Sequence, residues 1–278
     1  MSHWASRAQP KIQVVTSLAR LLTTFLSATC FAAIAEPEST IRPSDPSLVA
    51  QGRFIYEKNC VPCHGVRGDG TGEMGLTVNP RPRNFTTGIF KFRSTPSGAL
   101  PTDDDLRRTI RGGLTGTAMP SFDALPERDI RAAAEYVKTF SRKWLQSENY
   151  AAPVTLPRMP TWFSDEEELN ARMIHGKALF VATCAPCHGE NGAGNGPAAT
   201  NGLTDVWGNA TTPSDLRQPQ LRCGREWRDI YRVLVTGLNG TPMPSFVDST
   251  TEEQRWEIIA YIERLRRDLR RDRLPITK

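Results

Sequence analysis

The sequence predicts an all-α fold made of two similar domains joined by an extended linker. Apolar residues recur at helical spacing in two parts of the chain, and the second part repeats the first at a constant offset. Between the repeats, residues 146–163 contain three prolines and show no helical period, which is typical of an extended connection. We therefore expect helical domains at residues 47–145 (the first repeat) and 164–278 (the second repeat), with a spacer at residues 36–46.

The repeat is visible in two separate stretches of sequence. GRFIYEKNCVPCHG begins at Gly52 and is matched by GKALFVATCAPCHG, which begins at Gly176. Further along, RTIRGGLTGTAMPSF begins at Arg108 and is matched by RVLVTGLNGTPMPSF, which begins at Arg232. Because both matches keep one offset across a divergent stretch, they indicate a duplicated domain.

Each repeat is expected to contain helices around these motifs. The first helix covers about residues 47–59, and its counterpart begins at Ser164 with a capping-box pattern. A middle helix begins near Thr102 with aspartates in its first turn, where the helix dipole favours acidic side chains. The last helices of the two repeats begin near Pro126 and Thr251.

Long loops rich in glycine and proline separate the first and middle helices, at residues 65–101 and 189–220. Loops of this length without structure of their own are unusual in a compact domain. Only 8% of the residues are aromatic, so two small domains would have thin cores if they were built of polypeptide alone. We therefore expect each loop to wrap a group that is not polypeptide.

The N-terminus has the pattern of a secretion signal. Basic residues precede the apolar stretch Leu21–Ala35, which ends in small residues, so cleavage before Glu36 is expected. The stretch is shorter than the roughly 20 residues of a membrane span. An uncleaved anchor is the alternative, and it would be the only route to membrane association. We expect residues 1–35 to export the chain to the periplasm, and Cys30 is discarded with this signal peptide because a poor lipobox precedes it.

The charge of the chain excludes one class of partner. The formal net charge is +5, but the first 35 residues supply three basic side chains and no acidic ones. The remaining 32 basic and 30 acidic residues are nearly balanced, which argues against nucleic acid as a partner. A run of arginines between Arg264 and Arg273 is interpreted as a solvated helix face, with a docking patch for an acidic partner or membrane surface as the alternative.

Two C-x-x-C-H motifs stand in register and indicate covalent haem attachment. Their members are Cys60, Cys63 and His64 in the first repeat, and Cys184, Cys187 and His188 in the second. Two thiols on one helical turn can form thioethers to the two vinyl groups of one porphyrin, and the histidine that follows becomes the proximal iron ligand. A redox dithiol would not need the histidine in both copies, and a zinc site would need four protein ligands.

The residue opposite the histidine decides between electron transfer and catalysis, because His/Met ligation closes the iron and raises its potential. Met119 follows His64 at the same separation in sequence as Met243 follows His188. Each methionine follows a Gly-Thr turn and precedes a proline, which suits a loop that holds a thioether in place. We therefore expect Met119 and Met243 to be the distal ligands.

Two other residues compete for a role at the second iron. His175 precedes Cys184 on the same predicted helix and is interpreted as an exposed helix residue. Cys223 has no partner once the four haem cysteines are used, and its counterpart by offset is Ala99. It is interpreted as a buried small residue, with a thiolate ligand in place of Met243 as the alternative.

With these residues in view, both repeats resemble class I cytochrome c domains. Each has a first helix with a small residue (Gly52 or Gly176), the C-x-x-C-H motif, a distal Met-Pro loop, and a last helix with an aromatic residue (Tyr136 or Tyr261). In that family the small and aromatic residues mark where the first and last helices cross. The resemblance implies an all-α domain around one covalent haem per repeat. The loop at residues 80–105 departs from the family pattern.

The resemblance to tandem periplasmic diheme cytochromes implies two haem c groups and electron transfer between redox partners, such as a periplasmic dehydrogenase, a reductase or a terminal oxidase. A diheme enzyme, peroxidase-like or thiosulfate-oxidising, is one alternative, and a permanently bound subunit of an oxidoreductase complex is another. Basic residues of the departing loop would steer an acidic partner or pair with haem propionates, and ordinary solvated loop charges are the alternative. They are Arg81, Arg83, Lys91 and Arg93.

Overall fold

A computed structural model describes residues 45–273, and over this range the chain forms helices and short helical turns without a β-strand. The all-α fold class expected from the sequence is therefore confirmed. The predicted signal peptide at residues 1–35 and most of the spacer lie outside the described residues. None of the helices in the described range has the length and the apolar run that a membrane crossing requires.

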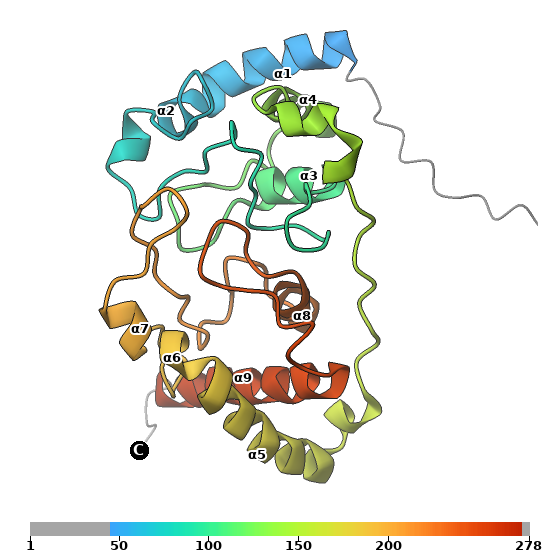
Figure 1. Cartoon of the computed structure of the whole chain (residues 1–278), viewed down its shortest axis with the longest axis vertical. Coiled ribbons are helices and arrows are strands. Elements are labelled where there is room, and N and C mark those ends of the chain that lie inside the picture. Colours follow the sequence, from blue (N-terminus) through green and yellow to red (C-terminus); the bar gives the residue numbers. More distant parts are fainter. Residues whose placement is uncertain (1–44, 274–278) are drawn as a thin grey trace, which may run out of the picture. The chain divides into compact units, whose positions relative to one another are not determined.

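The first repeat is built on two long helices and two shorter ones, shown in blue to green in Figure 1. They are α1 (Pro46–Asn59), α2 (Val61–His64), α3 (Asp103–Gly112) and α4 (Glu127–Lys138). A 3-10 turn, η1 (Met74–Leu76), packs against α2, and η2 (Arg142–Leu145) follows α4. Asp45 caps α1 by accepting a hydrogen bond from the Ser47 amide, at 2.9 Å.

The second repeat follows the same order of helices. They are α5 (Glu166–Thr183), α6 (Ala185–His188), α7 (Pro197–Thr200), α8 (Trp227–Thr236) and α9 (Glu252–Arg273). The expected start of the first of these helices at Ser164 is wrong by one residue. Asp165 is the N-cap, because its carboxylate accepts a hydrogen bond from the Glu168 amide at 2.9 Å, while Ser164 belongs to the 3-10 turn η4 (Thr161–Ser164).

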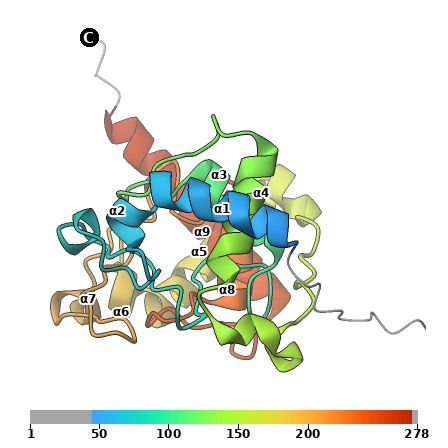
Figure 2. The same ribbon diagram turned by 90° about the horizontal axis from the view of Figure 1, so that it is seen from above.

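The first and last helices of each repeat cross at a glycine. Figure 2 shows α1 lying across α4, and α5 packs on α9 in the same way. A Cβ atom on Gly52 would overlap the carbonyl oxygen of Ala132 and would lie 2.9 Å from the Tyr136 Cβ. A Cβ atom on Gly176 would overlap the carbonyl oxygen of Glu257. The two helices can approach this closely only because both positions lack a side chain.

Residues 146–163, which we propose as the linker, are extended in the middle and ordered at both ends. Figure 1 shows this stretch as the green trace that leads from α4 to α5. In the turn η3 (Ser147–Asn149), the Asn149 carbonyl accepts a hydrogen bond from the Leu100 amide at 2.8 Å. At the other end, Trp162 is buried in the core of the second repeat. The stretch is therefore fixed to the repeats that it joins.

A buried arginine joins the two repeats. Arg93, only 1% exposed, donates from Nη2 to the Thr236 carbonyl at 2.5 Å and from Nε to the Pro96 carbonyl at 3.1 Å. Nearby, the Asn239 side-chain oxygen accepts a hydrogen bond from the Gly98 amide at 3.2 Å. Arg93 thus has a structural role, and the expectation that it steers a partner or binds a propionate is wrong.

The arginine run on α9 does not form one solvated face. Arg266 is 3% exposed, pairs with Glu263 at 2.7 Å and donates to the Leu216 carbonyl at 3.3 Å. Arg264 pairs with Asp268 at the surface, at 2.9 Å. The interpretation as a solvated face is therefore wrong for Arg266, which fastens α9 to the long loop of the second repeat.

Asp105 in the first turn of α3 gives a testable pH dependence. Its carboxylate is 0% exposed and accepts hydrogen bonds from Ser94 N at 2.7 Å and Thr102 N at 3.0 Å. Burial alone would raise its pKa, but the bonds from Ser94, Thr102 and Arg108 outweigh burial and lower the pKa. We expect Asp105→Asn to lower the free energy of unfolding by about 2 kcal/mol at pH 7.

The lowered pKa fixes how this loss changes with pH. A carboxylate with a depressed folded-state pKa stabilises the fold above its ordinary value of about 3.9, and this stabilisation disappears as the pH falls through the folded-state pKa. The wild-type chain should therefore lose stability below about pH 4 more steeply than Asp105→Asn. Urea unfolding followed by circular dichroism at pH 7, 5 and 3 checks this. If the difference in free energy of unfolding between the wild type and Asp105→Asn stayed the same at all three pH values, the lowered pKa of Asp105 would be contradicted.

Candidate functional site

Each C-x-x-C-H motif lies where the first helix of its repeat breaks and a single further turn begins. Cys60 N donates to the Tyr56 carbonyl at 2.8 Å, and Cys184 N donates to the Phe180 carbonyl at 2.8 Å. The histidine amides then bond back to the first cysteine of each motif, also at 2.8 Å. The five cysteines of the described residues form no disulfide. Both thiols of each motif are therefore on one helical turn and available for attachment.

A backbone carbonyl orients each motif histidine. His64 Nδ1 lies 3.1 Å from the Arg83 carbonyl oxygen, and His188 Nδ1 lies 3.0 Å from the Ser214 carbonyl oxygen. Because a carbonyl only accepts, Nδ1 carries the proton and the Nε2 lone pair remains available for a metal. Burial lowers the pKa of His64 to about 4 and also lowers the pKa of His188. Both rings are therefore neutral, as iron ligation requires.

Sequence reasoning missed these two carbonyls because their positions do not follow the constant offset between the two repeats. Arg83 lies closer in sequence to His64 than Ser214 does to His188, so the constant offset between the repeats fails here. A local signal was present in both loops. Each position follows a proline and precedes an Asn or Asp whose side chain caps a turn two residues further on, as the Asp215 oxygen does for the Arg217 amide at 3.0 Å.

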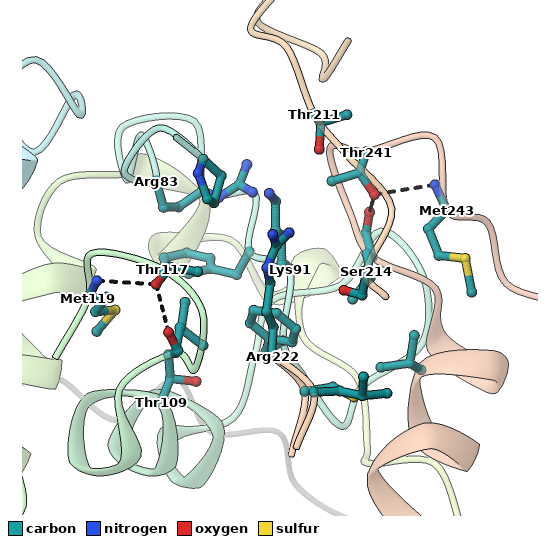
Figure 3. Close-up of a pocket in the computed structure, with 18 of the residues that line it drawn as sticks. Arg83, Lys91, Thr109, Thr117, Met119, Thr211, Ser214, Arg222, Thr241 and Met243 are labelled. Carbon is teal, nitrogen blue, oxygen red and sulfur yellow. Dashed lines mark hydrogen bonds between the residues drawn. The ribbon is translucent and has the colours of Figure 1, made fainter. Parts of the chain in front are cut away.

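The Met-Pro loops fold into the same hydrogen-bonded turn in both repeats. Met119 N donates to the Thr117 hydroxyl at 3.1 Å, and Leu114 N donates to the Met119 carbonyl at 3.1 Å. In the second repeat, Met243 N donates to the Thr241 hydroxyl at 3.3 Å (Figure 3). Each loop is fixed at its backbone next to the methionine.

The glycine that opens each Met-Pro loop explains its sharp turn. Gly113 has a φ of +61°, and a Cβ atom there would lie 2.5 Å from the Pro120 carbonyl oxygen. Gly237 has a φ of +65°, and a Cβ atom there would lie 2.7 Å from the Pro244 carbonyl carbon. The left-handed backbone and the close approach both require glycine. The G-L-x-G-T-x-M-P sequence is therefore a structural unit that places one methionine.

All eight residues expected to bind haem line one cavity of about 400 Å³. They are Cys60, Cys63, His64, Met119, Cys184, Cys187, His188 and Met243. Most of the remaining wall is apolar, with Phe85, Phe90 and Ile110 from the first repeat. The long loops supply much of this wall, as expected for segments that wrap a non-polypeptide group.

The cavity fits two haem groups by the chemistry of its donors. It offers free thiol pairs, neutral imidazoles and thioethers in the numbers that two covalent haems need. It also contains one orphaned cation: Arg83 Nη1 is buried and has no hydrogen-bond partner among the described residues. An unpaired buried cation indicates that an anionic group belongs beside it. The residues present therefore match a prosthetic group that is apolar over most of its surface and anionic at one edge.

The two competing residues are placed differently from the eight. His175 is 72% exposed and lies 3.6 Å from a Glu257 carboxylate oxygen, so it is an exposed helix residue as expected. Cys223 lines the cavity, but burial, with a smaller effect of Asp229, raises the pKa of its thiol to about 12. Without a metal, Cys223 is therefore a neutral thiol, and it is partly buried where a buried residue was expected.

Comparison with known proteins identifies both repeats. The family model described as "Cytochrome C oxidase, cbb3-type, subunit III" matches residues 47–137 and again residues 171–262. A chain of the Kuenenia stuttgartiensis reducing HAO-like protein complex has a similar structure, with a TM-score of 0.68 and 36% sequence identity. That match covers 77% of this chain and 95% of the other.

Curated relatives carry names from the same family. The subunit FixP of the cbb3-type cytochrome c oxidase of Azorhizobium caulinodans is 28% identical over 57% of this chain and 44% of its own length. The subunit CcoP of the Rubrivivax gelatinosus oxidase is 27% identical over 73% of this chain and 53% of its own length. The chain therefore spans about half the length of the curated relatives that it matches.

Proposed function

Because the chain belongs to the cbb3-type cytochrome c oxidase subunit III family, we propose that it passes electrons between two redox protein partners by way of the cavity shared by its repeats. The coarser function follows from the family: the two matched domains bind haem c, and such domains carry electrons or serve as subunits without being catalytic themselves. The partners are the proposed part.

The residues of the cavity divide the work of holding the prosthetic groups. The thiols of Cys60 and Cys63 attach one haem and those of Cys184 and Cys187 the other. His64 and His188 would hold the two irons, because burial keeps their rings neutral and the carbonyls of the long loops orient them. When bound, haem c supplies a one-electron iron couple.

The methionines distinguish a carrier from an enzyme. Met119 and Met243 would each offer a thioether to one iron, which would leave no open position for a substrate. The turns that hold the two methionines have the same hydrogen bonds, which argues that both irons are closed in the same way. The apolar wall keeps water away and favours the reduced state, as in other His/Met cytochromes.

The observation that carries this proposal is the presence of two complete donor sets on one cavity. The test is a pyridine haemochrome assay combined with a reductive titration of the purified chain. Two haems and uptake of two electrons per chain, with rapid oxidation by a second cytochrome, are expected. Fewer than two haems, or turnover of peroxide or thiosulfate by the isolated chain, would contradict a carrier.

A bound subunit is the second candidate, and the names of the relatives favour it. FixP and CcoP are named as subunits of cbb3-type oxidases, and the similar solved chain belongs to a protein complex. As a subunit, the chain would receive electrons in the periplasm and pass them to the oxidoreductase complex to which it is bound. Mild detergent extraction from the native host, followed by native gels stained for haem, separates the two candidates. A free chain runs as a small haem-stained band of its own, whereas a subunit migrates with its complex.

A further inference from the structure

Three basic side chains from both repeats meet inside the cavity. Arg83 and Lys91 come from the long loop of the first repeat, and Arg222 lies just after the long loop of the second, before α8. Figure 3 shows them converging between Met119 and Met243. We call Arg83, Lys91 and Arg222 the basic cluster.

The basic cluster has almost no partners of its own. Arg83 stacks on the Trp207 ring, with its guanidinium carbon 4.4 Å from the ring centroid, and its Nη1 atom is buried without a hydrogen bond. Arg222 makes one long bond, at 3.5 Å, to the Thr212 carbonyl. Among the ion pairs of residues 45–273, none includes a member of the cluster.

Electrostatics give the same picture. Burial lowers the pKa of Lys91 to about 8, with a smaller contribution from the charges of Arg83 and Arg222. Burial also lowers the pKa of Arg83 to about 10 and lowers that of Arg222. The carboxylate of Asp205 opposes these shifts in Arg83 and Lys91, but it makes no ion pair with them and accepts hydrogen bonds from the amides of its own turn, including Trp207 N at 3.0 Å. Three partly buried cations on one cavity, none of them in an ion pair among the described residues, indicate a missing anion.

Arg93 shows what a buried arginine with only a structural role looks like in this chain. It is more deeply buried than the members of the basic cluster, and its nitrogens reach the carbonyls of Pro96, Thr236 and Gly237. Its contacts need no further group. Arg83 lacks such contacts, so the structure does not account for its charge by packing alone.

The second repeat has no cation of its own at the equivalent place. Ser214 is the counterpart of Arg83, because the carbonyls of the two residues hold the two motif histidines. An anion that belongs to the second repeat therefore finds its positive partners largely in the first repeat. The only cluster residue that the second repeat supplies is Arg222.

From this arrangement we propose that the basic cluster is a single anion site shared by the two repeats, which receives the propionate carboxylates of both haem groups. The proposal rests on the haem placement argued under the proposed function. Arg83, Lys91 and Arg222 are positioning residues in this role. Their shared charge ties the electrostatic surroundings of one iron to those of the other.

The distinctive consequence is an effect that crosses from one repeat to the other. Arg83→Gln removes a positive charge from the first repeat, and loss of a nearby cation favours the oxidised form of an iron. We expect the equilibrium constant for reduction of both haems to fall threefold or more, which is about 28 mV for one electron. Spectroelectrochemical titration resolves two steps, and Met243→Ala identifies the step that belongs to the second repeat.

The controls use the same measurement. Arg228→Gln removes an exposed arginine of the second repeat and should leave both potentials unchanged. Lys91→Gln removes a cation but keeps the stack on Trp207, so it tests the site in a chain with undisturbed packing. Arg83→Lys should restore most of the lost potential, and resonance Raman bands of the propionates should shift in Arg83→Gln and Lys91→Gln alone.

Two results would overturn the shared site. Movement of the first-repeat potential alone in Arg83→Gln and Lys91→Gln would assign the cations to one haem, and unmoved potentials in both variants would remove the anion site altogether. A haemochrome assay on the wild-type chain separates these from failure of the proposed function. Two haems with unmoved potentials contradict only the basic cluster, whereas fewer than two haems contradict the haem placement itself.

Discussion

Met243→Ala should lower the midpoint potential of the second-repeat haem by at least about 59 mV, a tenfold change in the equilibrium constant of a one-electron step. The reason is that a thioether ligand favours the reduced iron, and ligand identity tunes haem potentials over a range of about 0.8 V. The turn that holds Met243 stays anchored by the Thr241 hydroxyl, so the substitution removes the sulfur without removing the loop. The measurement is a spectroelectrochemical titration with two resolved steps.

The optical spectrum supplies an independent readout of the same change. The near-infrared band from methionine sulfur to ferric iron should fall by half in Met243→Ala, and by half in Met119→Ala. Met159→Ala is the control, because this methionine lies in the linker and is 40% exposed. If Met243→Ala kept the full band while Cys223→Ala altered the spectrum, the distal ligand of the second repeat would be the thiol.

Gly52→Ala should lower the free energy of unfolding by about 3 kcal/mol or more, the upper range for overpacking. The added Cβ would overlap the Ala132 carbonyl oxygen on α4, and a backbone atom inside a helix cannot move aside as a flexible side chain can. The helices must separate, and this opens the contact on which the first repeat is built. Urea unfolding followed by circular dichroism measures the loss, and Gly176→Ala repeats the test at the contact with Glu257.

Gly112→Ala is the matched control for this prediction. Gly112 is the last residue of α3, and no atom lies within 4 Å of the place that its Cβ would occupy. Alanine loses less backbone entropy than glycine and favours helix, so this variant should gain about 0.5–1 kcal/mol. Equal effects at Gly52 and Gly112 would show that helix propensity, and not the crossing, decides the outcome.

The sequence predicted the parts of the fold that depend on local pattern. The order of helices follows from the apolar spacing, and the start of α3 at Thr102 follows from the aspartates of its first turn. The start of α5 was misplaced by one residue because Ser164 and Asp165 are both good caps, and Ser164 instead ends the turn η4, which contains the buried Trp162. Such choices depend on packing between distant segments, which local pattern does not contain.

The eight expected haem-binding residues come together on one cavity because both sets belong to repeated motifs. Residues that act through a contact between the repeats were harder to interpret. Arg93 and Arg83 are both arginines of the same basic loop, and nothing local in the sequence tells them apart. Arg93 donates hydrogen bonds to carbonyls of the second repeat, whereas Arg83 has an unpaired nitrogen in the cavity. Arg222 was not singled out, because nothing in its local sequence shows that it meets charges from a loop of the other repeat.

The carbonyls that hold the two histidines also show how duplicated repeats can diverge. Both long loops are pinned alike, by Phe85 N to the Gly68 carbonyl at 2.7 Å and by Leu216 N to the Gly192 carbonyl at 2.8 Å. Between these pins the second loop is several residues longer. Closing the longer loop costs only about 0.3 kcal/mol more in chain entropy. Insertions between these two hydrogen-bonded positions therefore cost little folding free energy. Each repeat can change the length and sequence of its long loop while the histidine keeps its place.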